Sequence, residues 1–255
     1  MSDRRRGVPH RALDLPEPQV GSVASTDGGA AGVVLLLHGG RADSFAPPPA
    51  LNLAGLRMRP FARALRGSTR TANVLVGSVR FRMRGWNGER ADPVGDARQA
   101  LAEAEEAVGP LPVVLLGHSM GARAALRAAD GGHVRGVVAL APWCPPDEPV
   151  SHLAGRTVIA LHDEADAMTS AAGTWTYLRR AEEAGARVRG VRMPTGRHTM
   201  LRGAGLWHRL AARFAAEILD LPAPPGASAP RAEWGAGPTD AAEFRTGTGR
   251  DVRPF

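Results

Sequence analysis

The chain has 255 residues, of which 44% are hydrophobic and 22% are charged, and its formal net charge is +7. This length and apolar content suit one large domain with a substantial core, and they exclude a chain that is disordered throughout. The single cysteine, Cys144, excludes an internal disulfide framework and a cysteine-rich zinc site, and it favours a cytoplasmic location.

The basic charge does not by itself predict a nucleic-acid partner. All 32 basic residues are arginines spread along the chain, a bias typical of a GC-rich genome. The small arginine groups at 4–6 and 80–84 are not interleaved with aromatic residues that would stack on bases. The longest aliphatic run, residues 33–37, is far shorter than the roughly 20 residues of a membrane span. We therefore expect neither a nucleic acid nor a membrane as partner.

Short apolar strands alternate with amphipathic helices along residues 31–221, which we take as one domain. The strands are predicted at residues 33–37, 73–79, 113–116, 134–140, 157–161 and 187–191, and the helices at 56–65, 92–108, 122–129, 171–184 and 206–219. Asp92 is the expected N-cap of the second helix, with Pro93 at its first position. The fold class is therefore α/β, with a parallel sheet covered by helices on both faces.

The two ends of the chain differ in composition from this domain. Residues 1–30 are polar and rich in proline and glycine, with an edge strand expected around 20–24. Residues 222–255 contain few large apolar side chains, which predicts a flexible C-terminal tail. Its aromatic residues are the ones that would dock it on the domain, namely Trp234, Phe244 and Phe255.

The sharpest chemical feature is the pentapeptide Gly-His-Ser-Met-Gly at residues 117–121. It follows the predicted strand at 113–116 and precedes an alanine-rich helix. A serine hydroxyl acts as a nucleophile only when it is exposed and a base activates it, and a tight strand–turn–helix connection presents it in that way. The pentapeptide alone is weak evidence, but its position in the predicted fold points to a nucleophilic Ser119.

These pieces together resemble the α/β-hydrolase superfamily, in particular its small, lidless bacterial serine hydrolases of actinobacterial type. The matching pieces are His-Gly-Gly at 38–40 after the first strand, the elbow at 117–121, an acidic turn after the fifth strand, Gly-Arg-His at 196–198, and the segments 84–88 and 141–145. The resemblance implies the α/β-hydrolase fold. Residues 141–156 are all needed to connect two strands, so we expect no cap domain.

The resemblance also implies a catalytic triad in the chain order serine, acid, histidine. Ser119, Asp166 and His198 follow that order. His198 stands between the last strand and the last helix, and an imidazole of ordinary pKa suits proton transfer from serine. His38 and His118, which flank glycine-rich loops, are expected to be structural.

The identity of the triad acid stays open. Asp166 aligns with the aspartate of the family's strand–His–Gly–x–x–Asp turn. Asp163 stands where the family usually has glycine, so Asp163 and Glu164 are alternatives. Asp147, after the fourth strand, is a further alternative because some family members supply the acid from that position.

Two backbone N–H groups are expected to stabilise the oxyanion of an acyl-transfer reaction. One belongs to Met120, directly after the nucleophile, and the other by similarity to Gly40, with Arg41 as the alternative. Trp86 and Trp143 follow strands at the same edge of the sheet. They suit the wall of a substrate pocket as well as they suit core packing.

We therefore expect a serine hydrolase that cleaves a carboxylic ester or thioester of small to medium size through an acyl-enzyme on Ser119. No spacing of metal ligands or phosphate-binding glycines is present, so neither a metal nor a cofactor is expected. An acyltransferase, a cyclase or a cofactor-free perhydrolase would use the same triad. A non-catalytic ligand-binding protein on this fold is the alternative outside enzymes.

Overall fold

An eight-stranded sheet forms the centre of the molecule in the order β1-β3-β2-β4-β5-β6-β7-β8. A computed structural model describes residues 10–15, 29–222 and 234–244. The strands are β1 (Leu13–Asp14), β2 (Gly32–Leu37), β3 (Val74–Val79), β4 (Val113–His118), β5 (Val134–Leu140), β6 (Thr157–His162), β7 (Arg187–Arg192) and β8 (Gly235–Asp240). Only β1 runs antiparallel to its neighbour, so the other strands end at one common edge.

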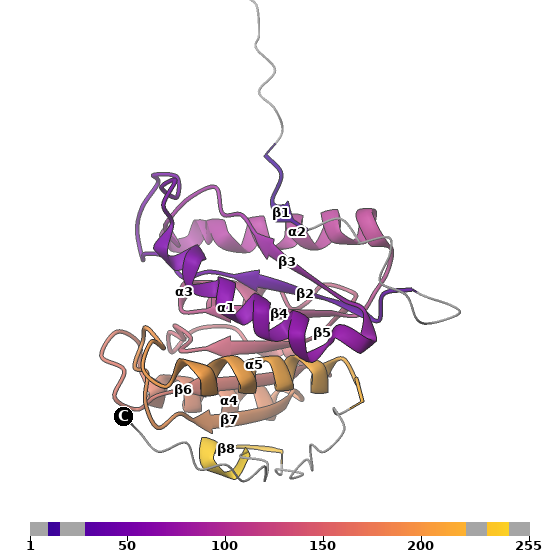
Figure 1. Cartoon of the computed structure of the whole chain (residues 1–255). Helices are drawn as coiled ribbons and strands as arrows, with labels where there is room; N and C mark the ends of the chain where they lie inside the picture. The colour runs from indigo at the N-terminus through magenta and orange to yellow at the C-terminus, as the bar shows by residue number, and fades with distance from the viewer. Residues whose placement is uncertain (1–9, 16–28, 223–233, 245–255) are drawn as a thin grey trace, which may run out of the picture.

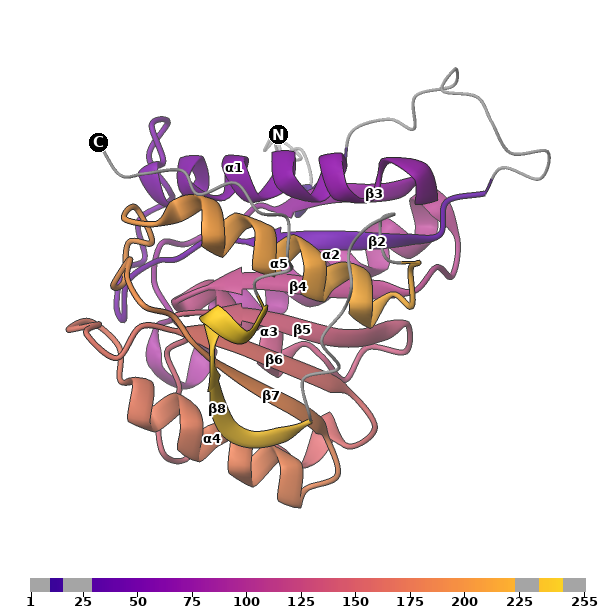
Figure 2. The ribbon, with the colours of Figure 1, turned by 60° about the horizontal axis from the view of Figure 1, so that its bottom comes forward.

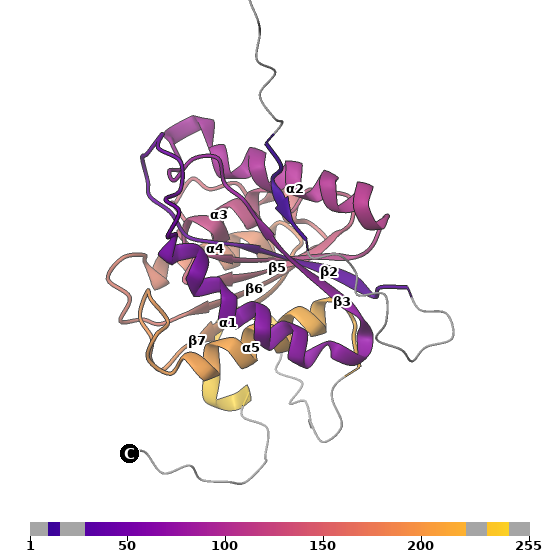
Figure 3. The ribbon, with the colours of Figure 1, turned by 45° about the horizontal axis from the view of Figure 1, so that its top comes forward.

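Within the described residues, five α-helices cover the two faces of this sheet (Figure 1). They are α1 (Leu53–Ser68), α2 (Asp92–Val108), α3 (Met120–Arg127), α4 (Ala171–Glu183) and α5 (Ala204–Ile218), and the short 3₁₀ helices are η1 (Arg70–Ala72), η2 (Gly88–Arg90), η3 (Ser151–Leu153) and η4 (Ala241–Phe244). Figures 2 and 3 show α1 and α5 side by side on one face, with α2, α3 and α4 on the other. The sheet is thus the middle of three layers.

The apolar strands face two separate cores because successive side chains of a strand point to opposite faces. In β2, Val33 and Leu35 join the core under α2, α3 and α4, whereas Val34 and Leu36 join the core under α1 and α5. All the β2 residues are buried, as expected for a central parallel strand.

The predicted fold class is confirmed, and the six strands and five helices expected from the sequence are found with ends shifted by no more than three residues. Residues 141–156 connect β5 to β6 with only η3 between them, and the described part of the chain contains no cap domain. No helix within the described ranges is both long enough and apolar enough to span a bilayer.

The expected N-cap of α2 is wrong. Asp92 is the first residue of the helix, and the residue before it, Ala91, is in the left-handed conformation with φ 44°. The Asp92 carboxylate instead accepts hydrogen bonds from Asn87 at 2.8 Å and from Arg90 at 3.0 Å. Its side chain therefore holds the preceding turn rather than the first helical N–H groups.

The expectation of a flexible tail over 222–255 is wrong for the part that the structure describes. Strand β8 pairs in parallel with β7, and η4 follows it. Phe244 is 4% exposed and meets Phe214 of α5 edge to face, with ring centroids 5.2 Å apart. Phe255 and the edge strand expected around 20–24 lie outside the described residues.

We predict that Phe244→Ala destabilises the protein by about 3 kcal/mol, because it leaves a hole beside Phe214. Urea unfolding of the purified variant measures this change. Glu243→Ala, which alters an exposed neighbour in the same 3₁₀ helix, is the control and should stay within about 0.5 kcal/mol of wild type. Equal stability of the Phe244→Ala protein and wild type would show that this segment does not dock in solution.

Candidate active site

Ser119 occupies a strained turn between β4 and α3. Its backbone has φ 55° and ψ −120°, a conformation that non-glycine residues seldom adopt. A Cβ atom on Gly117 would lie 2.5 Å from the Cα of Ala122, and one on Gly121 would collide with the carbonyl oxygens of Leu37 and His38. Both glycines of the pentapeptide are therefore required for the close packing of helix, strand and neighbouring loop around the serine.

His198 and Asp166 are brought together at the same edge of the sheet. The His198 Nδ1–H donates to Asp166 Oδ2 at 2.8 Å. The Asp166 side chain is fully buried and that of His198 is 14% exposed. An imidazole held in this way keeps its proton on Nδ1 and leaves Nε2 as the basic nitrogen.

Five hydrogen-bond donors surround the Asp166 carboxylate. Oδ2 also accepts from His162 Nε2 at 3.1 Å and from the Thr169 hydroxyl at 2.9 Å. Oδ1 accepts the backbone N–H groups of Met168 at 2.7 Å and Thr169 at 3.2 Å. Burial alone would raise the pKa of Asp166, but the hydrogen bonds from His162, His198 and the backbone outweigh it and lower that pKa well below its usual range. The carboxylate thus stays charged beside His198.

The alternative acids have other partners. Asp163 is buried, and its carboxylate accepts the N–H groups of Ala165 at 2.9 Å and Arg197 at 2.7 Å. Glu164 is exposed and pairs with Arg192 at 2.8 Å. Asp147 is exposed in the connection after β5. The geometry therefore joins Asp166 to the imidazole of His198. Asp163 instead links the loop after β6 to the loop after β7.

His118 links the nucleophile turn to the histidine loop. Its Nε2–H donates to the carbonyl oxygen of His198 at 2.9 Å, and the centroids of the two rings lie 4.9 Å apart. Burial and the neighbouring His198 lower the pKa of His118 to about 3. A ring that is neutral at ordinary pH therefore ties the backbone of His198 to the residue that precedes Ser119.

Sequence reasoning missed His162, which contacts both sides of the acid turn. Its Nδ1 lies 2.8 Å from the Thr174 hydroxyl, while Nε2 donates to Asp166. The only sequence signal was its place directly before Asp163 in the aligned turn.

The two expected oxyanion donors belong to the start of α3 and to the loop after β2. Met120 is the first residue of α3, so its N–H has no acceptor inside the helix. A Cβ atom on Gly40 would lie 2.5 Å from the Met120 sulfur, so the Gly40 backbone packs against the Met120 side chain. The rival donor, the Arg41 N–H, is bound to the carbonyl oxygen of Arg84 at 2.9 Å. The geometry therefore favours Gly40 over Arg41.

Trp86 and Trp143 enclose a guanidinium group. Arg123 of α3 lies 3.8 Å from the ring centroid of Trp86 and 4.4 Å from that of Trp143. Glu148, which is buried, accepts from Arg123 and also from Arg127 of the same helix. Trp86 is 2% exposed, so this cluster accounts for its burial. A role of either ring in a substrate pocket stays a prediction.

Cys144 has no features of a nucleophile. Burial and the nearby Glu148 carboxylate raise the pKa of its thiol. The reactive thiolate form is therefore scarce at neutral pH.

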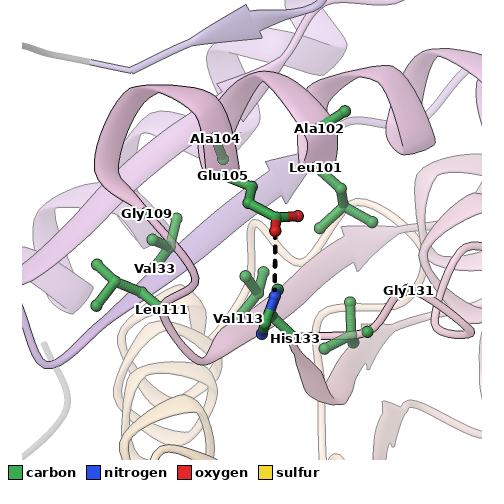
Figure 4. Close-up of a pocket in the computed structure, with 12 residues that line it drawn as sticks. Val33, Leu101, Ala102, Ala104, Glu105, Gly109, Leu111, Val113, Gly131 and His133 are labelled. Carbon is green, nitrogen blue, oxygen red and sulfur yellow. Dashed lines mark ion pairs between the residues drawn. The ribbon is translucent and has the colours of Figure 1, made fainter.

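A small cavity lies at the opposite edge of the sheet (Figure 4). It has a volume of about 150 Å³ and is lined mostly by apolar side chains, with Glu105 and His133 in contact at 3.3 Å. Val33, Val113 and Val134 line it near the starts of their strands, so it is remote from Ser119.

Comparison with known proteins gives a family for this fold and site. A family model described as "Alpha/beta hydrolase family" matches residues 34–252. No curated protein matches the sequence.

Solved structures provide similar folds at low sequence identity. MGS-M1, an alpha/beta hydrolase enzyme from a Medee basin deep-sea metagenome library, is 14% identical with a TM-score of 0.60, covering 83% of this chain and 100% of that chain. XC6422 from Xanthomonas campestris, described as an a/b serine hydrolase without lid, is 23% identical with a TM-score of 0.52, covering 84% and 90%. The esterase Est2 from Thermogutta terrifontis, with propionate bound, is 17% identical with a TM-score of 0.57, covering 82% and 88%.

We predict a specific pH effect of His118→Gln on stability. The unfolded chain protonates this histidine below about pH 6.5 and the folded protein only near pH 3, so His118 destabilises the fold as the pH falls between these values. The stability of wild type relative to the variant should then fall by roughly 1.4 kcal/mol per pH unit between pH 6 and 4. Urea unfolding at several pH values measures this, and parallel curves would contradict it.

Proposed function

Because the chain belongs to the alpha/beta hydrolase family, we propose that it is a serine hydrolase that cleaves a carboxylic ester or thioester of small to medium size. The observation that carries this proposal is the 2.8 Å hydrogen bond from His198 to the buried Asp166. It lies at the sheet edge where the strained turn presents Ser119. Serine, imidazole and carboxylate are the groups that acyl transfer requires.

In the proposed reaction, the Ser119 Oγ attacks the acyl carbon and its proton passes to His198 Nε2. The imidazolium that forms is stabilised by the charged Asp166, whose lowered pKa keeps it from taking the proton itself. The N–H groups of Met120 and Gly40 stabilise the tetrahedral oxyanion. His198 then protonates the leaving alcohol or thiol.

The second half of the reaction releases the acid. Water enters, His198 takes one of its protons, and the hydroxide oxygen attacks the acyl carbon of the ester on Ser119. The second tetrahedral oxyanion collapses, and the proton on His198 returns to Ser119 Oγ. One water is consumed for each ester cleaved, and the enzyme is regenerated.

Two features support a substrate of modest size. The described part of the chain contains no cap domain, so no second domain shapes a deep binding cleft above Ser119. The esterase Est2, whose fold is similar, was solved with propionate bound. Short acyl groups are therefore the first substrates to test.

We predict that a fluorophosphonate probe labels the wild-type protein and fails to label Ser119→Ala or His198→Ala. The same variants should hydrolyse p-nitrophenyl acetate and butyrate at least roughly 10⁴-fold more slowly, because each removes one member of the triad. Cys144→Ala is the matched control and should be labelled like wild type. Labelling that survives in Ser119→Ala, or a folded wild type that is not labelled, would contradict the proposal.

A second pair of variants identifies the acid. We predict that Asp166→Asn lowers kcat by roughly 10⁴-fold, because an amide holds His198 in the wrong tautomer. Asp147→Asn changes an exposed aspartate and should leave the rate within a few fold of wild type. Steady-state kinetics on p-nitrophenyl butyrate, with unfolding curves to check the fold, measure both. The opposite ranking would assign the acid to the connection after β5.

A further inference from the structure

The large apolar side chains that are most exposed gather at the catalytic edge of the sheet. Five of them, with exposures between 62% and 76%, form a set that we call the apolar rim: Phe45, Leu51, Leu53, Met168 and Leu201. They stand in the loops after β2, β6 and β7 or at the first residue of α1. In the described ranges, the one other exposed large apolar side chain is Trp234.

The residues of the apolar rim belong to segments at the same edge of the sheet as the proposed triad. The loops after β2, β6 and β7 project from the same side of the molecule in Figures 1, 2 and 3. The Met168 N–H donates directly to Asp166, and Leu201 is three residues beyond His198. Exposed apolar side chains scattered singly are ordinary, but their concentration beside one site indicates an interaction surface.

Arginines border this rim on the side of α1 and α5. The two helices pack together, with the rings of Phe61 and His208 4.5 Å apart, and both begin at the catalytic edge. Arg59 and Arg63 on α1, Arg202 in the loop before α5, and Arg209 on α5 are exposed.

Helices α1 and α2, on opposite faces of the sheet, differ in charge. Helix α1 has no acidic residue, whereas α2 on the opposite face has five acidic residues and one arginine. The helix that begins at the apolar rim is therefore the basic one of the two.

We propose that the apolar rim and these arginines dock the protein on an anionic lipid surface. Leucine, phenylalanine and methionine side chains enter the boundary between headgroups and acyl chains, while guanidinium groups bind lipid phosphates. The choice of a lipid surface as the partner rests on the proposed function, because an ester in the lipid layer would reach Ser119 past the apolar rim. The short aliphatic runs of the sequence led us to expect no membrane partner, but docking of this kind needs no membrane span.

The position of the rim argues against two other occupants. A protein partner seated on it would cover the sheet edge that carries Ser119, whereas under the proposed function a lipid surface would itself supply the ester. A second copy of this chain would bring two arginine-bordered surfaces together, and like charges repel. Both features favour an anionic surface that is itself a source of ester.

The test is flotation of the full chain with vesicles of phosphatidylcholine alone and of an equimolar mixture with phosphatidylglycerol. We expect wild type to float with the anionic vesicles, to float far less with the neutral ones, and to be released by salt. The variant Leu51→Ser/Leu201→Ser and the variant Arg59→Gln/Arg202→Gln should each bind roughly 10-fold less. Arg179→Gln removes an exposed arginine from α4 on the other face and should bind like wild type.

The outcomes separate this inference from the proposed function. Ser119→Ala should float like wild type, because docking needs no chemistry. A wild type that is labelled by fluorophosphonate but does not float overturns the docking and keeps the hydrolase. Flotation without labelling overturns the hydrolase and keeps the docking. Equal flotation of the rim variants and wild type, or gel filtration showing a dimer that the rim variants lose, would also overturn the docking.

Discussion

A buried negative charge organises the catalytic edge of this molecule. A carboxylate without water is tolerated in a folded protein only when hydrogen bonds replace its solvation, and Asp166 has five donors around it. These donors come from the loop after β6, from His162 at the end of β6, and from His198 in the loop after β7. His198 is in turn held by His118 at the end of β4. The ends of three strands are therefore fixed to one another by polar contacts above an otherwise apolar sheet.

Much of the fold could be predicted because the central strands are apolar on both faces and the helices are amphipathic. The candidate residues Ser119, Asp166 and His198 could be named because family pattern and chain order point to them. The choice between Asp166 and Asp163 could not be made from spacing, since both lie in one turn and only the path of the backbone decides which reaches the imidazole. The contact of His118 was equally hidden, because its acceptor is a carbonyl group that every residue possesses.

The remaining differences arise where tertiary contacts override local composition. Strand β8 has the sequence Gly-Ala-Gly-Pro-Thr-Asp, which lacks the apolar periodicity that would predict a strand. It forms because the backbone N–H and C=O groups at the edge of β7 can pair with it. The packing of Phe244 against Phe214 adds to its stability. The two tryptophans illustrate the same limit. No sequence pattern shows that Trp86 and Trp143 enclose Arg123, since all three are distant in the chain.

The enclosed Arg123 also limits how this scaffold can be remodelled. Its counter-ion Glu148 belongs to the connection between β5 and β6, which contains no cap domain. Glu148 joins that connection to α3 through its ion pairs with the two arginines of this helix. The backbone N–H of Trp143 also donates to the carbonyl oxygen of Ser119 at 3.4 Å. A grafted lid would have to pull this carboxylate away from two buried or half-buried arginines. An engineer seeking a more enclosed enzyme should therefore lengthen the loop after β2 within residues 47–51, beyond the stretch 41–46 whose backbone is hydrogen-bonded to residues 84–87.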